Sequence, residues 1–329
     1  MDTLILSGGK AIELGAQIIK SGGIVAFPTE TVYGLGACAY DSDAIAAVFA
    51  AKGRPMDNPL IVHLASSKDI SSVSCGYDER YRPLIDKFMP GPLTLVVKKR
   101  ADIPDCVTAG LDTIGVRIPS HPVAREFIAA CAVPIAAPSA NLSTKISPTS
   151  ARHVYEDMNG RVPLIIDGGD CEVGIESTVL DITGDIPVIL RPGAVTAEQI
   201  ADVLGSVKTH EGKIVAAAPA PGMKYKHYAP VCDCVVASSV SSAVEEYGRR
   251  VDDGGNPVIL CKSEHIGIYG DIHTIGLGAD DSEICRNIYA AMHTAEKSYD
   301  CIICEDLGDS GLLGSVMNRV NKSAGGKII

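Results

Sequence analysis

The chain has 329 residues, of which 46% are hydrophobic and 21% are charged, and its mean hydropathy is +0.19. This length predicts two domains, each with its own core, and the composition excludes a disordered, collagen-like or coiled-coil protein. The net charge of −11 excludes a broad surface for nucleic acid or anionic lipid, because such a surface needs an excess of basic residues.

No apolar run reaches the ~18 residues of a membrane span, and the start, MDTLILSGGK, lacks the basic region of a signal peptide. We therefore expect a cytoplasmic protein whose eleven cysteines are buried thiols rather than disulfides. Cys301 and Cys304 are included in this interpretation, since two isoleucines fill the gap between them as in a buried strand. A zinc or redox site is the alternative for this pair.

Residues 1–208 alternate strand-like and helix-like patterns, which predicts a mixed α/β domain. The predicted strands are 23–27, 60–64, 93–97, 113–118, 135–138, 163–167, 177–182 and 188–190. The predicted helices are 11–20, one capped by Asp41 or Ser42, 121–132, 150–158 and 197–204. In strand 113–118, the alternation places the isoleucines and valine on one face and Arg117 on the other.

Residues 209–230 differ in composition from what precedes them. Ala and Pro dominate, and a compact Lys, Tyr and His cluster ends at Pro230, as is typical of a connection between domains. From Val231 a second α/β pattern begins, with strands at 231–237, 257–261, 271–277 and 301–307 and helices near 241–250, 282–297 and 313–322. We expect domains at 1–208 and 231–329, joined by a linker at 209–230. The second should be a small three-layer domain with a largely parallel sheet.

Polar residues gather where the predicted strands of the first domain end, which is where α/β proteins tend to bind ligands. Residues 28–36 follow an apolar strand and are expected to form a turn bounded by glycines. Lys52 and Arg54, held by Gly53 and Pro55, suit a polyphosphate, although a cation at a helix end such as Lys52 is favourable without any ligand. Hydroxyls and arginines with few candidate bases favour the binding of anionic substrates over covalent catalysis.

In chain order the polar groups read PTETVYGLG (28–36), KGRP (52–55), NPLIVH (58–63), GVRIP (115–119), APSAN (137–141), ESTVLD (176–181) and RPG (191–193). This ordered set resembles the YrdC-like family, and GMKYKHYAP (222–230) is similar to the linker of its two-domain members. The resemblance implies a twisted mixed α/β domain, similar to double-stranded-RNA-binding folds, followed by a small Rossmann-like three-layer domain. It also implies synthesis of L-threonylcarbamoyladenylate and pyrophosphate from L-threonine, bicarbonate or CO2, and ATP. This would be the first step of threonylcarbamoyladenosine modification of tRNA next to the anticodon.

The resemblance further implies roles for individual residues. Catalysis would involve Lys52, Arg54, Ser139 and Asn141. ATP would be bound by Arg54, Asn58, Thr113, Ser139, Ser147, Arg191 and Tyr228. L-threonine would be bound by Thr31, His63, Arg117 (on the carboxylate), Ala137 (through its backbone) and Ser177. A lid over the cavity would be formed by Tyr225, Lys226, His227 and Tyr228.

Mg2+ is expected to arrive mainly on the ATP phosphates, with no protein ligand assigned to it. The expected partners are separate threonylcarbamoyl-transferase proteins that act on tRNA. We expect this chain neither to associate with a membrane nor to bind nucleic acid strongly and directly. Three alternatives stay open: an RNA-binding regulator, a carbamoyl-transferring enzyme of hydrogenase maturation, and a scaffold with a vestigial pocket. The acidic balance of both parts, 18 basic against 24 acidic residues in 1–208 and 11 against 16 in the rest, opposes the first. An enzyme of hydrogenase maturation would carry acylphosphatase-like and zinc-finger regions that this sequence does not show. The complete set of polar groups opposes a scaffold with a vestigial pocket.

Overall fold

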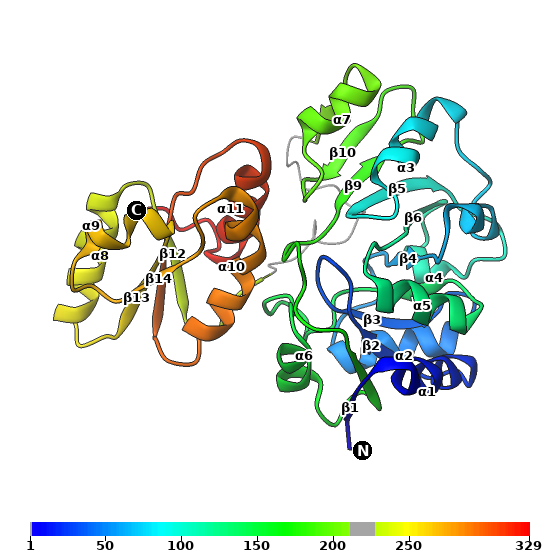
Figure 1. The fold of residues 1–329 in the computed structure, drawn as a ribbon, viewed down its shortest axis with the longest axis horizontal. Helices are drawn as coiled ribbons and strands as arrows, with labels where there is room; N and C mark the ends of the chain where they lie inside the picture. The colour runs from blue at the N-terminus through cyan, green and yellow to red at the C-terminus, as the bar shows by residue number, and fades with distance from the viewer. Residues whose placement is uncertain (1, 211–227) are drawn as a thin grey trace. The chain divides into compact units, whose positions relative to one another are not determined.

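The computed structural model describes residues 2–210 and 228–329, and these residues form two compact units (Figure 1). Unit 1 comprises 2–143, 148–172 and 176–210, and unit 2 comprises Thr144–Ser147, Val173–Ile175 and 228–329. Two short segments from within 1–208 therefore belong to unit 2. A division of the chain at one linker does not anticipate this arrangement.

Unit 1 is built on a mixed sheet of eleven described strands in the order β1-β8-β2-β3-β7-β4-β6-β5-β9-β10-β11 (Figure 1). The strands are β1 (Leu4–Ser7), β2 (Val25–Phe27), β3 (Gly34–Cys38), β4 (Ile61–His63), β5 (Leu93–Lys98), β6 (Thr113–Arg117), β7 (Ile135–Ala137), β8 (Leu164–Asp167), β9 (Thr178–Asp181), β10 (Val188–Arg191) and β11 (Lys208–Thr209). In the middle of the sheet, β4 runs parallel to β6 and antiparallel to β7. The expected mixed α/β fold is confirmed.

Some helices of unit 1 begin at a residue whose side chain caps them. The helices of this unit are α1 (Gly8–Lys20), α2 (Ser42–Lys52), α3 (Arg82–Phe88), α4 (Asp105–Thr108), α5 (Pro122–Cys131), α6 (Ala151–Met158) and α7 (Ala197–Leu204), with short 3-10 turns at Ser67–Ser72 and Glu79–Tyr81. The Asp41 carboxylate caps α2 by accepting two backbone N–H groups. Helix α2 ends because Gly53 adopts a left-handed conformation, with φ at 62°. Arg54 therefore lies off the helix.

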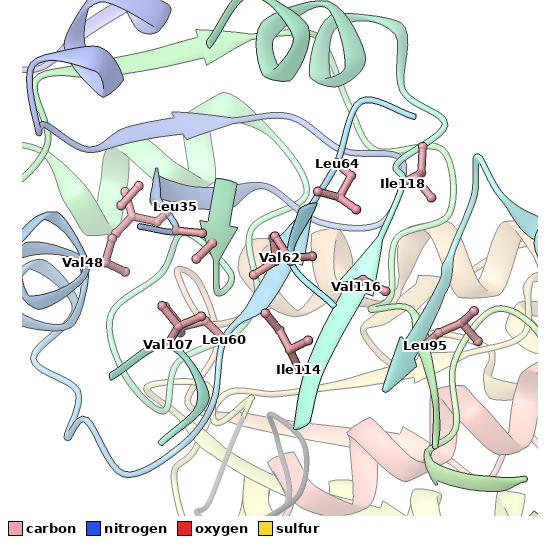
Figure 2. Packing of buried hydrophobic residues seen from close by; sticks show 14 of the residues in the cluster. Leu35, Val48, Leu60, Val62, Leu64, Leu95, Val107, Ile114, Val116 and Ile118 are labelled. Carbon is pink, nitrogen blue, oxygen red and sulfur yellow. The ribbon is translucent and has the colours of Figure 1, made fainter. Parts of the chain in front are cut away.

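One face of the sheet packs onto the main hydrophobic core of unit 1. Strand β4 contributes Val62 to this core and β6 contributes Ile114 and Val116, as Figure 2 shows. These side chains alternate with those of the opposite face. The alternation predicted for strand 113–118 is therefore confirmed, and it leaves Arg117 on the other face.

The opposite face of the sheet carries two smaller apolar clusters. Helices α1 and α5 pack over β2, β7 and β8 in the first, around Phe27. The second consists of Ile61, Val96 and Val179, which come from β4, β5 and β9. Ile61 pairs in register with Ala137, which belongs to the first cluster, so both clusters lie on the same face.

Residues 34–36 are strand rather than turn, so the expected glycine-bounded turn over 28–36 is wrong in its second half. They begin β3, which pairs antiparallel with β2. A sequence with two glycines is atypical of a strand, but here the glycines permit close packing. A Cβ on Gly36 would lie 2.6 Å from Cγ2 of Ile135 and 2.9 Å from Cε1 of Phe27. Strand β1 and helix α3 were also not predicted.

Unit 2 contains four described parallel strands in the order β12-β15-β13-β14. They are β12 (Asp233–Ala237), β13 (Pro257–Cys261), β14 (Thr274–Gly276) and β15 (Cys301–Glu305). The helices are α8 (Val240–Asp252), α9 (Ile266–Tyr269), α10 (Asp281–Ala295) and α11 (Gly311–Ser323), with a 3-10 turn at Ser263–His265. Helices α8 and α9 lie on one side of the sheet and α10 and α11 on the other (Figure 1). The expected small three-layer arrangement is confirmed.

The cysteines are free thiols, and most of them are buried. Cys301 and Cys304 lie in β15 with 0% and 1% of their surface exposed, which confirms the interpretation of this pair as core residues. Burial raises the pKa of the Cys301 thiol to about 12. Cys75 is exposed, so the expectation of buried thiols is wrong for that residue.

None of the helices in the described ranges combines the length and the hydropathy that a membrane crossing requires.

Candidate functional site

Polar side chains from neighbouring strands gather on the sheet face that also carries the Ile61 cluster. His63 ends β4 and pairs in register with Arg117 at the end of β6. On β5, the Thr94 hydroxyl oxygen lies 2.8 Å from that of Ser177, which immediately precedes β9. Arg191 ends β10 and donates a hydrogen bond of 2.9 Å to the Ser177 carbonyl oxygen. Residues from separate sequence motifs therefore form one buried polar row.

The row contains a buried ion pair, and sequence reasoning assigned no role to its acidic member. The distance from Arg117 Nη2 to Glu30 Oε1 is 2.7 Å, and the two side chains are 5% and 2% exposed. The two groups are not aligned as a hydrogen bond, and neither Glu30 oxygen receives a hydrogen bond from the described residues. Arg117 Nε donates a long hydrogen bond of 3.4 Å to the Gly91 carbonyl oxygen. The sequence feature that could have indicated a role for Glu30 is its position in PTET, directly after an apolar strand.

His63 is a neutral imidazole in this row. Burial, followed by the neighbouring Arg117 charge, lowers the pKa of His63 to about 3. Its Nδ1 lies 3.2 Å from the Ile61 carbonyl oxygen, and Nδ1 is therefore the donor because a carbonyl only accepts. The ring packs edge-on against Phe27, with 5.8 Å between the ring centroids. His63 thus offers hydrogen bonding and shape without adding charge.

Thr31 and Ala137 also lie in unit 1, close to the residues named above. Thr31 is fully buried, and its hydroxyl oxygen lies 2.9 Å from that of Thr29. The Thr29 hydroxyl in turn donates to the Val32 carbonyl oxygen, so the predicted side-chain bonding within this turn is confirmed. Ala137 ends β7, where it pairs with Ile61.

A second group of predicted residues lies toward the opposite end of β4 and β6. Thr113 begins β6, four residues or about 13 Å from Arg117. Asn58 lies just before β4 and is fully buried, and its side-chain amide has no hydrogen-bond partner among the described residues. Arg54 donates a hydrogen bond of 3.1 Å to the Asn58 carbonyl oxygen. A buried amide without a partner indicates a place for a ligand or water.

Lys52 is tied to the loop that follows β7. Its ammonium nitrogen lies 2.6 Å from the Ser139 carbonyl oxygen, 2.6 Å from that of Asn141 and 3.3 Å from Asn141 Oδ1. An ammonium has three donors, so these three contacts use all of them. Burial, with a smaller contribution from Arg54, holds the pKa of Lys52 well below its usual value. A direct contact between Lys52 and phosphate stays a prediction, and it requires at least one of these bonds to break.

The remaining predicted residues lie in unit 2 or outside the described ranges. Ser147 and Tyr228 are buried in unit 2. Tyr228 has a positive φ of 64° and stacks on Tyr289, with 5.6 Å between the ring centroids. The Ser147 carbonyl oxygen lies 3.3 Å from Nε2 of His293. The predicted lid residues Tyr225, Lys226 and His227 lie outside the described residues.

Comparison with protein families gives two matches that together cover most of the chain. Residues 17–193 match the Sua5, YciO and YrdC family model, which is described as telomere recombination. Residues 195–325 match the model described as the C-terminal domain of threonylcarbamoyl-AMP synthase.

Relatives named threonylcarbamoyl-AMP synthase match over nearly the whole chain. The protein of Pyrococcus abyssi is 44% identical over 97% of this chain and 95% of its own length. The protein of Bacillus subtilis is 41% identical over 97% of this chain and 94% of its own length. Among solved structures, P. abyssi Sua5 complexed with L-threonine matches with a TM-score of 0.94 at 40% identity, and the match covers 100% of this chain and 99% of that one.

A mixed sheet with a buried polar row, followed by a small parallel three-layer unit, defines a two-domain protein of the YrdC-like class. The chain belongs to the Sua5, YciO and YrdC family, and its full-length relatives within that family are threonylcarbamoyl-AMP synthases.

Proposed function

We propose that this chain is an L-threonylcarbamoyladenylate synthase. The observation that carries the proposal is the full-length similarity to relatives with that name, 44% identical over 97% of this chain for the P. abyssi protein. The amine of L-threonine adds to CO2 with loss of a proton, or to bicarbonate with loss of water, and forms a carbamate. A carbamate oxygen then attacks the α-phosphorus of ATP, which forms the new P–O bond and breaks the bond to pyrophosphate.

The two groups of residues along β4 and β6 support this reaction. Arg117, with His63, Thr31, Ala137 and Ser177 around it, would bind L-threonine at one end. At the other end, Arg54 would balance the phosphate charge as a fork-shaped donor. The remaining residues predicted to bind ATP are Asn58, Thr113, Ser139, Ser147, Arg191 and Tyr228. The remaining residues predicted to take part in catalysis are Lys52, Ser139 and Asn141. Positioning and charge stabilisation, rather than a covalent intermediate, would then lower the barrier.

Mg2+ would enter this site bound to the phosphates of ATP. Among the described residues, no group of three or more His, Cys, Asp or Glu side chains is placed to hold a metal ion. The basic residues of the site suit the phosphate oxygens and not the cation. The ion would supply further charge neutralisation on the pyrophosphate leaving group.

The setting of the reaction is also part of the proposal. The product would pass in the cytoplasm to separate proteins that transfer the threonylcarbamoyl group to tRNA. The assignment of Tyr225, Lys226, His227 and Tyr228 as a lid stays a prediction.

Pyrophosphate release from ATP by the purified protein tests the proposal. L-threonine and bicarbonate are omitted in turn, in a buffer purged of CO2. We expect release only when both are present. Release that is independent of threonine would contradict the proposed reaction, and so would an absence of release under every combination.

A further inference from the structure

Glu30 is a buried carboxylate whose surroundings in unit 1 leave it incompletely satisfied. Its side chain is 2% exposed, and the ion pair with Arg117 is its one polar contact among the described residues. Both carboxylate oxygens lack a hydrogen-bond donor among the described residues. Because an ionised carboxylate accepts several hydrogen bonds and its burial without them is costly, the position points to a donor that arrives with a ligand.

The neighbours of Glu30 restrict what that donor is. Arg117 faces it from β6, and the Cys171 thiol is close enough for the Glu30 charge to add to the burial that raises the pKa of Cys171. That thiol is therefore protonated at neutral pH. Thr31 is the next residue in the chain, and its hydroxyl contacts that of Thr29. A cationic donor that also brings an anion for Arg117 would satisfy both members of the pair.

An α-amino acid has these two charges at the required spacing. Its ammonium nitrogen and a carboxylate oxygen are about 3 Å apart, from standard bond lengths. In the ion pair, Arg117 Nη2 and Glu30 Oε1 are 2.7 Å apart, so a cationic and an anionic group face a ligand at a similar spacing. A zwitterion placed alongside the pair sets its carboxylate against Arg117 and its ammonium against Glu30.

We propose that Glu30 binds the α-ammonium group of L-threonine while Arg117 binds its carboxylate, so that the ion pair is a recognition element for the amino-acid zwitterion. The proposal rests on the proposed function, because it takes L-threonine as the substrate. It adds a residue that selects amino acids over hydroxy acids.

A merely structural role for Glu30 makes a different prediction. If Glu30 only holds Arg117 in place, its loss weakens the binding of every ligand that contacts Arg117, whether or not the ligand has an ammonium group. If Glu30 binds the ammonium group, its loss weakens the binding of L-threonine alone. A ligand without the amine then binds more tightly, because the Glu30 carboxylate no longer competes with it for Arg117.

The test compares L-threonine with (R)-3-hydroxybutanoate, which keeps the carboxylate and the hydroxyl but lacks the amine. Calorimetric titrations with both ligands, with and without a non-hydrolysable ATP analogue, are run on the wild type and on Glu30→Gln. We expect the Kd for L-threonine to rise about 10- to 100-fold in the variant, since a hydrogen bond between charged groups is lost. The Kd for (R)-3-hydroxybutanoate should stay the same or fall. The exposed Glu172→Gln is the matched control and should leave both unchanged.

Equal weakening of both ligands in Glu30→Gln would overturn the proposal, and so would unchanged binding of L-threonine. If Glu30→Gln does not fold, Glu30→Asp keeps the charge but shortens its reach, and it must still weaken L-threonine selectively. The wild type must in addition prefer L-threonine over (R)-3-hydroxybutanoate at least about 10-fold. If the wild type binds no L-threonine, the proposed function fails as well. If it binds L-threonine and only the selectivity result fails, the proposed function stands without this role for Glu30.

Discussion

At the scale of single residues, three cations of unit 1 have different surroundings. Lys52 has all three donors in bonds to the loop after β7, and Arg117 faces Glu30. Arg54 donates to a backbone carbonyl and packs over the Phe49 ring, with 5.5 Å to the centroid. These surroundings predict that similar charges differ in how much they contribute to stability and to activity.

Arg54→Ala should lower the rate of pyrophosphate release by about 100-fold or more while leaving the protein folded. The reason is the loss of a fork-shaped donor to the phosphates, where charge develops in the transition state. The measurement is kcat/KM for ATP together with a denaturant titration. A variant with near-normal turnover would contradict the phosphate role of Arg54.

His63 should make stability depend on pH in a predictable direction. Its pKa is lowered to about 3 in the fold, against about 6.5 when unfolded. Between these values the unfolded chain binds a proton that the folded chain does not, so stability falls as pH drops below about 6.5. The slope from this group is at most about 1.4 kcal/mol per pH unit.

His63→Gln should flatten the pH dependence of the unfolding free energy by that amount between pH of about 4.5 and 6.5. Urea titrations of the two proteins at matched pH values measure the difference in unfolding free energy. The contributions of the other titrating groups are the same in both proteins and cancel in this difference. Identical pH dependence in the two proteins would contradict the neutral, buried state of His63.

At the scale of elements, the site depends on loops that the flanking strands and helices hold in place. The loop at Ser139 and Asn141 is tied to the last residue of α2 by Lys52, and β3 packs closely against its neighbours through its glycines. The capped start of α2 and the faces of β6 were predictable because capping and two-residue alternation are local. The Lys52 contacts and the strand at Gly34–Cys38 were not predictable, since they depend on residues distant in sequence.

Lys52→Met should destabilise the protein by about 1–3 kcal/mol, because a buried carbonyl of Asn141 and a part-buried carbonyl of Ser139 lose their donor. Arg54→Ala is the matched control, and it should cost less than about 1 kcal/mol. Urea unfolding of both variants gives the comparison. If Lys52→Met is as stable as the wild type, the ammonium does not hold this loop.

Gly36→Ala should destabilise the protein by about 1–3 kcal/mol through overpacking against Ile135 and Phe27. Gly9→Ala on α1 is the control, because a Cβ there meets nothing within 4 Å. It should be neutral or stabilising by up to about 1 kcal/mol. Thermal unfolding distinguishes the two, and a Gly36→Ala protein of unchanged Tm would contradict the packing described for β3.

At the scale of the whole molecule, the alternation of strand-like and helix-like patterns predicted the mixed fold of unit 1 and the parallel sheet of unit 2. These patterns did not predict that Thr144–Ser147 and Val173–Ile175 belong to unit 2, because membership of a unit depends on contacts and not on chain order. Glu30 was missed for the same reason. In sequence it is one polar residue of a turn, and its burial against Arg117 exists only in the folded sheet.

The most direct test of the account is the identity of the product formed from ATP, 15N-labelled L-threonine and 13C-labelled bicarbonate. Mass spectrometry of the rapidly quenched reaction should find a species that contains AMP and both labels, formed in step with pyrophosphate. A product with AMP and threonine but without the bicarbonate carbon would contradict threonylcarbamoyl-AMP synthesis. Free AMP or ADP as the only products, at every time after mixing, would contradict it too.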